Sequence, residues 1–461
     1  MRPRTQPLTF ADFELQAQGI VLDATLRALR DFLEAHDDLV TLVHQDLVRG
    51  LKRPRTGREG LGATQVLRAF VLQRIKAWDL RELRERIADG YTLRRFTTFD
   101  ARPVPKHDAF HRAFCRLTPT TLRALNDAVV QAAVALGLED GARLRVDTTV
   151  VETDIHWPTD SGLLWDAVRV LTRLVKRLGE QVPTARQGFA DRTRRARRRM
   201  QELHRLSPAE RPRQQTRKYR DFLGVTASVV ATARAAVATA RLAPPADPLA
   251  AAAVAALCDE IEHFGGLAER VMTQTRRRVL EGEQVPVHEK IFSIFEPHTD
   301  LIKRGKAQRP VEFGHKVFLA ESGGGFITDY RVLAGNPVDE GHVAPSLLQH
   351  ATTFGHAPTL YTPANVEAVT AAGVRTECLP QRGGTKTAER TAHEKSRSFK
   401  RGQRFRAGIE GRISVLLRGR GMRRCPLAGR ERFEVSAVLA NNLLRIATLL
   451  PPHAVSRRRA A

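Results

Sequence analysis

The sequence predicts a mixed α/β protein in which a helical region precedes a sheet and a long helical insertion interrupts it. Three observations support this fold class. Apolar residues recur at three- and four-residue steps over residues 13–50 and 63–136, as in amphipathic helices. The segment ARLRVDTTVVET, from Ala142, is rich in β-branched residues and is typical of a strand. Helical periodicity then returns from Ser161, and strand-like segments follow residue 285.

In chain order, residues 1–50 are expected to form a first helical segment, which a Pro/Arg/Gly-rich linker separates from the next. Residues 63–140 form a second helical region, typical either of a DNA-binding region or of an ordinary helical bundle. Residues 141–160 and 286–450 are expected to form the sheet domain, and residues 161–285 the helical insertion.

Two predictions concern the strands after the insertion. KIFSIF, from Lys290, is expected to be a strand. EFGHKVFLAE and GGGFITDYRVLAG are expected to form a hairpin that turns at Ser322–Gly325, where glycine permits a tight reversal.

The chain is strongly basic, with 75 Lys and Arg against 50 Asp and Glu and a net charge of +25 over 461 residues. The excess is spread along the chain, with dense blocks at Arg192–Arg199 and Lys395–Arg424. Such a protein most often binds a polyanion, because its cations release the counterions condensed on phosphates. A surface charged for solubility, or an arginine-rich proteome, would explain the charge without a partner. The Arg192–Arg199 block is correspondingly either a phosphate-tracking helix or a solvated face.

The four cysteines lie far apart without CxxC spacing, so neither a zinc ribbon nor a disulfide framework is indicated. No run of about eighteen apolar residues is present. We therefore expect a cytoplasmic protein that does not interact with a membrane.

Asp147 and Glu152 are the only acids in the segment LRVDTTVVET, and Asp147 is the lone Asp in its apolar interior. Burying a carboxylate costs free energy unless a partner compensates it. Asp147 either caps a turn at the strand end through the two threonines that follow, or binds a divalent cation, since hard oxygen ligands at the rim of a sheet suit Mg²⁺.

A second acid, Glu410, lies on a predicted helix within RFRAGIEGRISVLLRGRG. Four cations surround it in the sequence: Arg404, Arg406, Arg412 and Arg418. A salt-bridged glutamate on a solvated face is the ordinary interpretation. Alternatively, Glu410 shares a metal with Asp147 while the cations bind a DNA backbone, because two-metal phosphoryl transfer requires converging carboxylates.

Five stretches taken together resemble a known family: VDTTVVETDIHWPTDSGLLWDAVRVL, KIFSIFEPHTDLIKRGKAQRPVEFGHKVFL, GNPVDEGHV, LPQRGGTK and FRAGIEGRISVLLRGRGMRRCPLAGRERF. In these stretches the chain resembles insertion-sequence transposases of the DDE class, and among them the group called ISNCY. The resemblance covers nearly the whole chain.

The resemblance implies an RNase H-like catalytic sheet that binds Mg²⁺ or Mn²⁺. Asp147 would be the first catalytic Asp, at the end of the first strand, and Glu410 the final Glu, with Arg406 as its companion. The loop around Arg382 would track the DNA strand, and the helical region before Gly141 would recognise terminal inverted repeats. The implied partners are double-stranded DNA, both element ends and target, and further copies of the chain on that DNA. The implied location is the bacterial nucleoid.

The second catalytic Asp of the family has no identified counterpart here. In the family it lies on a short strand followed by Arg-Gly-Phe-Tyr, just before a Pro-x-Asn turn. The turn is present at Tyr361–Asn365, but the residues that should precede Tyr361 are missing, which indicates an in-frame loss of about seven or eight residues and of most of a strand. Asp329, Asp339 or Glu340 would replace this Asp only by converging on the metals.

Two functions from different classes remain. The first is a transposase that cleaves element ends and transfers a strand through the freed 3′-hydroxyl. The second is a catalytically inactive DNA-binding relative that occupies element ends or interferes with intact transposases. An RNA-binding or ribosome-associated protein would explain the charge, but not Asp147 and Glu410.

Overall fold

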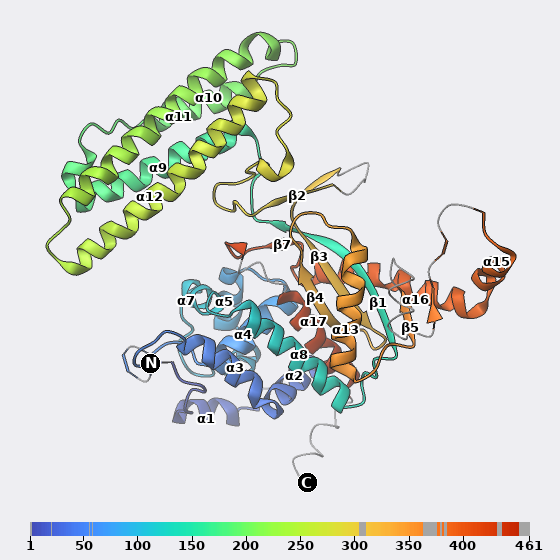
Figure 1. Ribbon diagram of the computed structural model, residues 1–461. Helices are drawn as coiled ribbons and strands as arrows, with labels where there is room; N and C mark the ends of the chain where they lie inside the picture. The colour runs from blue at the N-terminus through green and yellow to red at the C-terminus, as the bar shows by residue number, and fades with distance from the viewer. Residues whose placement is uncertain are drawn as a thin grey trace. The chain divides into compact units, whose positions relative to one another are not determined.

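The computed structural model describes residues 2–19, 21–54, 56–57, 59–303, 310–362, 376–378, 380–381, 385–430 and 436–450 (Figure 1). The chain is mixed α/β with a curled mixed sheet. It divides into two compact units, the first made of Met1–Glu152 with Ile302–Ala461 and the second of Thr153–Leu301. The N-terminal helices, expected to be separate from the sheet, therefore lie in the same unit as the sheet.

Local capping sets the start of several N-terminal helices. These helices are α1 (Phe10–Ala17), α2 (Ala24–Ala35), α3 (Asp37–Val48), α4 (Ala63–Lys76), α5 (Leu80–Asp89), α6 (Tyr91–Phe96), α7 (His107–Phe114) and α8 (Pro119–Ala135). The Asp23 carboxylate accepts a hydrogen bond from the Leu26 amide at the start of α2, and the Thr118 hydroxyl caps α8. The buried faces of α2 to α8 enclose one core that also contains Phe326 and Leu443 from the C-terminal half.

The sheet combines antiparallel and parallel pairing. Its strands are β1 (Arg143–Thr153), β2 (Asp300–Lys303), β3 (Val311–Ser322), β4 (Ile327–Val332), β5 (Leu360–Thr362), β6 (Thr376–Glu377) and β7 (Arg424–Cys425). The order is β2-β3-β1-β5-β6, with β4 added to β3 and β7 added to β1. β1 is antiparallel to β3 and parallel to β5, and β5 is parallel to β6. The predicted hairpin is confirmed, because β3 and β4 pair antiparallel around the turn at Ser322–Gly325.

Different helices cover the two faces of the sheet (Figure 1). The helices after the hairpin are η4 (Asp339–His342), α13 (Val343–Phe354), α15 (Ala388–Lys395), α16 (Arg397–Ser414), the π-helical turn η5 (Val415–Gly419) and α17 (Ser436–Leu449). Leu144 and Phe318 pack against α13 on one face. Val151 and Leu319 pack against the end of α16 and against η5 on the other. Because side chains alternate along a strand, Asp147 shares the face of Val151, which is the α16 face.

The second unit is a helical bundle with a hydrophobic core of its own. It contains α9 (Asp160–Gln181), η1 (Pro183–Arg186), α10 (Thr193–His204), α11 (Arg211–Leu242), α12 (Pro248–Thr275), η2 (Arg276–Leu280) and η3 (Val287–Glu289). By length and composition alone, α11 is the one helix in the described part that could cross a membrane. Its apolar residues, Phe222 and Val229 among them, are buried in this bundle, which is how a core helix meets the same criteria.

The strand predicted at Lys290–Phe295 is wrong, because these residues form no strand. Ile291 and Ile294 are buried in the core of the helical bundle, and the Ile291 amide donates a hydrogen bond to the Gln274 side chain at 2.8 Å. The apolar pattern of this segment therefore reflects burial against helices.

Candidate catalytic site and nucleic-acid interface

Asp147 is the fifth residue of β1 and lies on the sheet face that α16 covers. The side chain is half-buried, and its Oδ1 accepts a hydrogen bond from the Thr148 amide at 2.8 Å. The prediction that Asp147 ends its strand is wrong, because residues 148–152 continue the antiparallel pairing with β3 and β1 extends to Thr153. The carboxylate is therefore fixed mid-strand and remains partly accessible.

Glu410 is exposed on α16, and this helix contacts β1 through the side chain of Arg145. The Arg145 guanidinium, two residues before Asp147, donates a hydrogen bond to the Phe405 carbonyl oxygen of α16. Ile413, one turn after Glu410, packs into the apolar cluster between helix and sheet. The two predicted catalytic residues thus come from elements in direct contact, with Asp147 on the covered face and Glu410 on the exposed side of the helix.

A short strand occupies the position where the resemblance indicates a lost strand. Leu360 of β5 pairs with Arg143 of β1, and Thr362 pairs with Arg145. The described part of this strand ends there, two residues before the level of Asp147, and residues 363–375 lie outside the described residues. The strand is therefore present in shortened form, and none of its three residues, Leu-Tyr-Thr, is acidic.

Asp329 does not converge with Asp147. The register through β3 places Tyr330 of β4 on the same cross-strand row, and therefore the same face, as Asp147. Asp329, the neighbour of Tyr330, points to the opposite face, as side chains alternate along a strand. There its buried carboxylate forms ion pairs with Arg123 at 3.3 Å and Arg331 at 2.7 Å.

The described carboxylates do not complete a two-metal site. Within the residues that the structure describes, no group of three or more His, Cys, Asp or Glu could hold a metal ion. The side chains of Asp339 and Glu340, the other acids considered, lie outside that part of the chain. Asp147 and Glu410 alone do not fit the Mg²⁺ or Mn²⁺ pair that the resemblance implies, since each ion takes several oxygen ligands.

Glu321, which the sequence analysis missed, connects the strands to α16. This fully buried carboxylate on β3 lies 2.7 Å from the Arg145 guanidinium and 2.8 Å from that of Arg412. Arg412 also donates a hydrogen bond to Asn441 of α17 at 3.2 Å. The signal was present in the sequence, because Glu321 ends the apolar run VFLAE much as Asp147 interrupts another. Arg412, predicted to contact DNA, is thus engaged in an internal ion-pair network.

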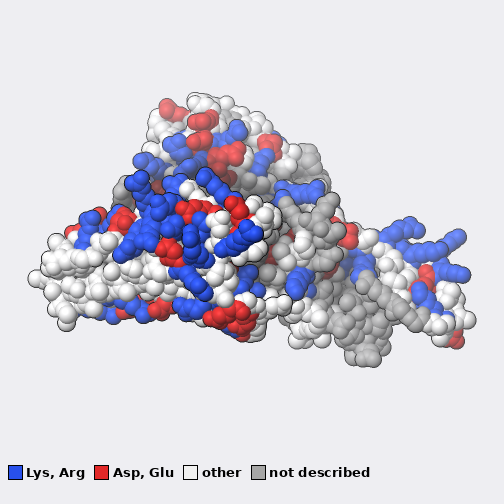
Figure 2. Space-filling model, turned by 90° about the horizontal axis from the view of Figure 1, so that it is seen from above, with Lys and Arg blue, Asp and Glu red and all other residues white. Residues whose placement is uncertain are grey.

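Exposed cations cover the start of α16. We name as the α16 basic surface four exposed side chains: Arg397, Lys400, Arg401 and Arg404. Figure 2 shows Lys and Arg side chains gathered at the end of the molecule where α15 and the start of α16 lie. Of the other predicted DNA contacts, Arg418 is exposed, Arg406 is half-exposed and Arg382 lies outside the described residues.

The basic block at Arg192–Arg199 lies largely on α10 of the second unit, and ion pairs engage part of it. Arg195 and Arg199 both pair with Asp221 of α11, and the hydrogen bond to Asp221 raises the pKa of Arg199. For these two side chains the arrangement favours the solvated-face interpretation.

No protein-family model matches this chain, and neither a curated protein nor a solved structure matches it. The basis for assigning a function is therefore the chemistry and geometry of the chain's own residues.

Proposed function

We propose that this chain is a DNA transposase of the DDE class that binds element ends and has lost its second catalytic acid. The observation that carries the proposal is the packing of α16 on β1, which joins the elements bearing Glu410 and Asp147. Carboxylates supplied by a strand and by a distant helix are the arrangement that metal-dependent phosphoryl transfer uses.

The strand arrangement supports an RNase H-like origin for the sheet. The antiparallel strands β4, β3 and β1 lie on one side, and the parallel strands β5 and β6 extend the sheet beyond β1. An antiparallel meander extended by parallel strands, with an acid on the strand where the two parts meet, is the arrangement expected of such a sheet. Asp147 occupies that strand.

The α16 basic surface supports DNA as the partner. From Thr385 to Glu410 the chain has eight Lys or Arg and three Glu, and the four cations of the surface are exposed. Exposed cations on the helix that bears Glu410 would fix a phosphate backbone beside that residue, and their affinity would fall with rising salt.

The DNA interface is tested by measuring binding to duplexes taken from the DNA that flanks the gene, over a series of salt concentrations. Arg401→Gln with Arg404→Gln should weaken binding and lower the slope of log K against log salt by about two, roughly one per lost phosphate contact. Arg270→Gln, a change of an exposed arginine on α12, is the matched control and should leave the slope unaltered. An unchanged slope in the double variant would exclude α16 as the interface.

A second candidate function, DNA binding without cleavage, is favoured by the end of described β5 two residues before the level of Asp147. A labelled element end incubated with Mg²⁺ or Mn²⁺ distinguishes the two functions. A 3′-hydroxyl product that disappears in Asp147→Asn and in Glu410→Gln would establish catalysis. Binding without product in the wild-type chain would establish the binding-only function. Resequencing codons 358–362 of the gene would show whether the missing strand residues are absent from the gene itself.

A further inference from the structure

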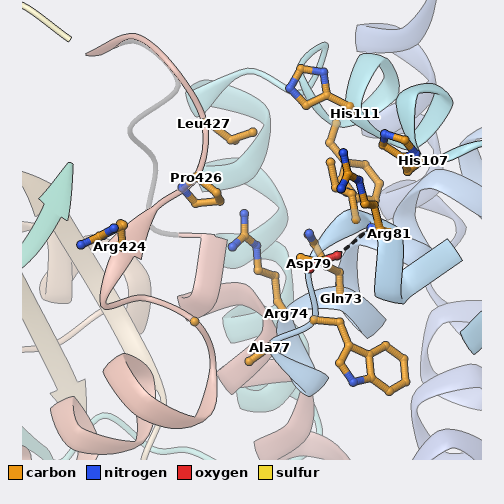
Figure 3. Close-up of a pocket in the computed structure, with 14 residues that line it drawn as sticks. Gln73, Arg74, Ala77, Asp79, Arg81, His107, His111, Arg424, Pro426 and Leu427 are labelled. Carbon is orange, nitrogen blue, oxygen red and sulfur yellow. Dashed lines mark hydrogen bonds between the residues drawn. The ribbon is translucent and has the colours of Figure 1, made fainter. Parts of the chain in front are cut away.

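A basic pocket in the first unit lies apart from Asp147 and Glu410 and has no role in the proposed chemistry. The end of α4, the start of α5, helix α7 and the segment Gly421–Leu427 enclose a cavity of about 520 Å³. The polar side chains among its lining residues are Gln73, Arg74, Asp79, Arg81, His107, His111 and Arg424 (Figure 3).

Arg74 is the central feature of this pocket. The residue is only 8% exposed, and its Nε has no hydrogen-bond partner. In the described part of the chain no carboxylate acts on it, and its attractive contacts are with the face of the Phe70 ring, 5.7 Å away, and with Cys425. Burial accordingly lowers the pKa of the Arg74 guanidinium. An uncompensated buried cation of this kind is costly and requires a partner.

Figure 3 shows the Arg74 side chain extending into the space between Pro426 and Asp79. The neighbouring residue, Gln73, is 6% exposed, and its Oε1 is a buried acceptor without a partner. The base of the pocket therefore holds a guanidinium and a neighbouring amide, each with one buried polar atom that has no partner within the protein. The guanidinium suits a ligand that carries anionic oxygens.

The rim of the pocket adds positive charge. Arg81 is exposed, whereas Arg424 pairs with Glu152 at 3.5 Å and His107 with Asp108 at 3.2 Å. The acid at the rim, Asp79, accepts hydrogen bonds from the backbone amides of Arg81 and Glu82 at 2.7 and 2.9 Å, where it caps α5. Asp79 is not among the groups that act electrostatically on the Arg74 guanidinium.

We propose that this pocket binds a phosphate group, with Arg74 as its charged anchor and Arg81 as a second contact at the mouth. A phosphate oxygen would accept the charge-assisted hydrogen bond that Arg74 lacks. The exclusion of water at this buried side chain would strengthen that bond. The phosphate belongs to a nucleotide, to a nucleic-acid backbone or to the free ion, which share this chemistry. The site requires neither a metal nor Asp147 and Glu410, so it stands independently of catalysis by the chain.

Thermal unfolding of the full chain tests the proposal, with inorganic phosphate titrated against chloride at equal ionic strength. Phosphate should raise the melting temperature of the wild-type chain in a saturable manner, since it binds only the folded state. Arg74→Met should remove this response, while its stability without phosphate should equal or exceed that of the wild type, because an unpaired buried charge is gone. Arg112→Met is the control: Arg112 is exposed on α7 and does not line the pocket, so this variant should respond like the wild type.

Arg81→Gln, a change at an exposed position, provides a second measurement if Arg74→Met does not fold, and it should weaken phosphate binding about tenfold. Competition by AMP and by a short 5′-phosphorylated duplex then identifies the source: displacement by AMP alone assigns a nucleotide, and displacement by the duplex assigns nucleic acid. A wild-type chain that shows no phosphate-specific stabilisation would overturn the proposal. The proposal would also be overturned if Arg74→Met or Arg81→Gln responded to phosphate as the wild type does.

Discussion

At Glu321, two guanidinium groups compensate a carboxylate with no exposed surface. The contacts are with Arg145 of β1 and Arg412 of α16, at 2.7 and 2.8 Å. Because Arg145 also donates to the backbone of α16, the same residues fix both the neighbouring strand and the helix that bears Glu410. Glu321 therefore positions the elements of the candidate site, although its ion pairs are with Arg145 and Arg412.

Glu321→Gln should destabilise the first unit by about 3–5 kcal/mol, because removing one partner of a buried ion network leaves the guanidinium groups uncompensated. Urea unfolding followed by circular dichroism measures the change. The matched control is Glu82→Gln, which breaks an exposed pair with Arg86 and should cost less than about 1 kcal/mol. Equal effects of the two changes would contradict a central role for Glu321.

His350 gives the fold a dependence on pH. Burial lowers its pKa from 6.5 to about 4; the hydrogen bond of its Nε2 with the Gly141 carbonyl opposes this shift, and His356 adds to it. The folded chain thus binds fewer protons than the unfolded chain between these values. This contribution to stability is complete above pH 6.5 and is lost progressively as the pH falls to about 4.

In His350→Gln, the decline in the free energy of unfolding from pH 6.5 to 4.5 should be shallower than in the wild type by roughly 1–2 kcal/mol. Urea titrations at a series of pH values provide the measurement. His288→Gln, which removes a histidine that is 82% exposed, should leave the wild-type pH profile intact. A wild-type slope retained in His350→Gln would assign the dependence to other groups.

Among the elements, α16 packs closely on the sheet through its glycines. A Cβ on Gly402 would lie 2.0 Å from the Cys378 sulfur, and a Cβ on Gly408 would lie 2.2 Å from a guanidinium nitrogen of Arg145. Gly411 on the same helix has nothing within 4 Å of such a Cβ. Gly402 and Gly408 therefore permit α16 to approach its neighbours closely. Gly411 permits no such approach, and it makes the helix less stable than alanine would.

Gly402→Ala should destabilise the first unit by about 1–3 kcal/mol through overpacking, although alanine favours helix. Gly411→Ala should instead stabilise it by about 0.5–1 kcal/mol, because only the backbone entropy changes. Thermal melting of both variants checks these opposite signs. A gain in stability from Gly402→Ala would show that α16 does not pack this tightly.

How far the elements could be predicted depends on the range of the interactions that form them. The hairpin at Ser322–Gly325 follows from local chemistry, and the sequence predicts it. The caps at Asp23 and Thr118 are equally local in origin. The strands β5 and β6 have three and two residues, and they exist only through pairing with distant partners. Segment Lys290–Phe295 shows the same limit, since its apolar residues pack into helices instead of a sheet.

For the candidate site, the sequence singled out Asp147 and Glu410 because acids in apolar or basic surroundings are conspicuous. It did not identify the contact of Arg145 with Phe405, which brings their elements together across a long sequence separation. Nor did it identify Arg74, because an arginine on a helix gives no sign of being buried without a partner.

For the whole molecule, the important feature is that the two units have separate cores. Phe110 is fully buried in the core of the first unit, and Phe222 is fully buried in that of the second. We expect two unfolding transitions in calorimetry, since the hydrophobic core of each unit is complete without residues of the other unit. Phe222→Ala should cost about 3–5 kcal/mol and lower one transition, and Phe110→Ala should lower the other by a similar amount. A single transition that shifts in both variants would show that the units unfold together.

The register of β5 against β1 also bears on how such a gene changes over generations. Thr362 is level with Arg145, so a strand that continued in this register would reach the level of Asp147 after two further residues, on the same face. An acid at that level of the strand, acquired by recombination with an intact copy or by a short insertion, would stand beside Asp147. On the proposed function, a single genetic event of that size would separate a chain that only binds DNA ends from one that also cleaves them.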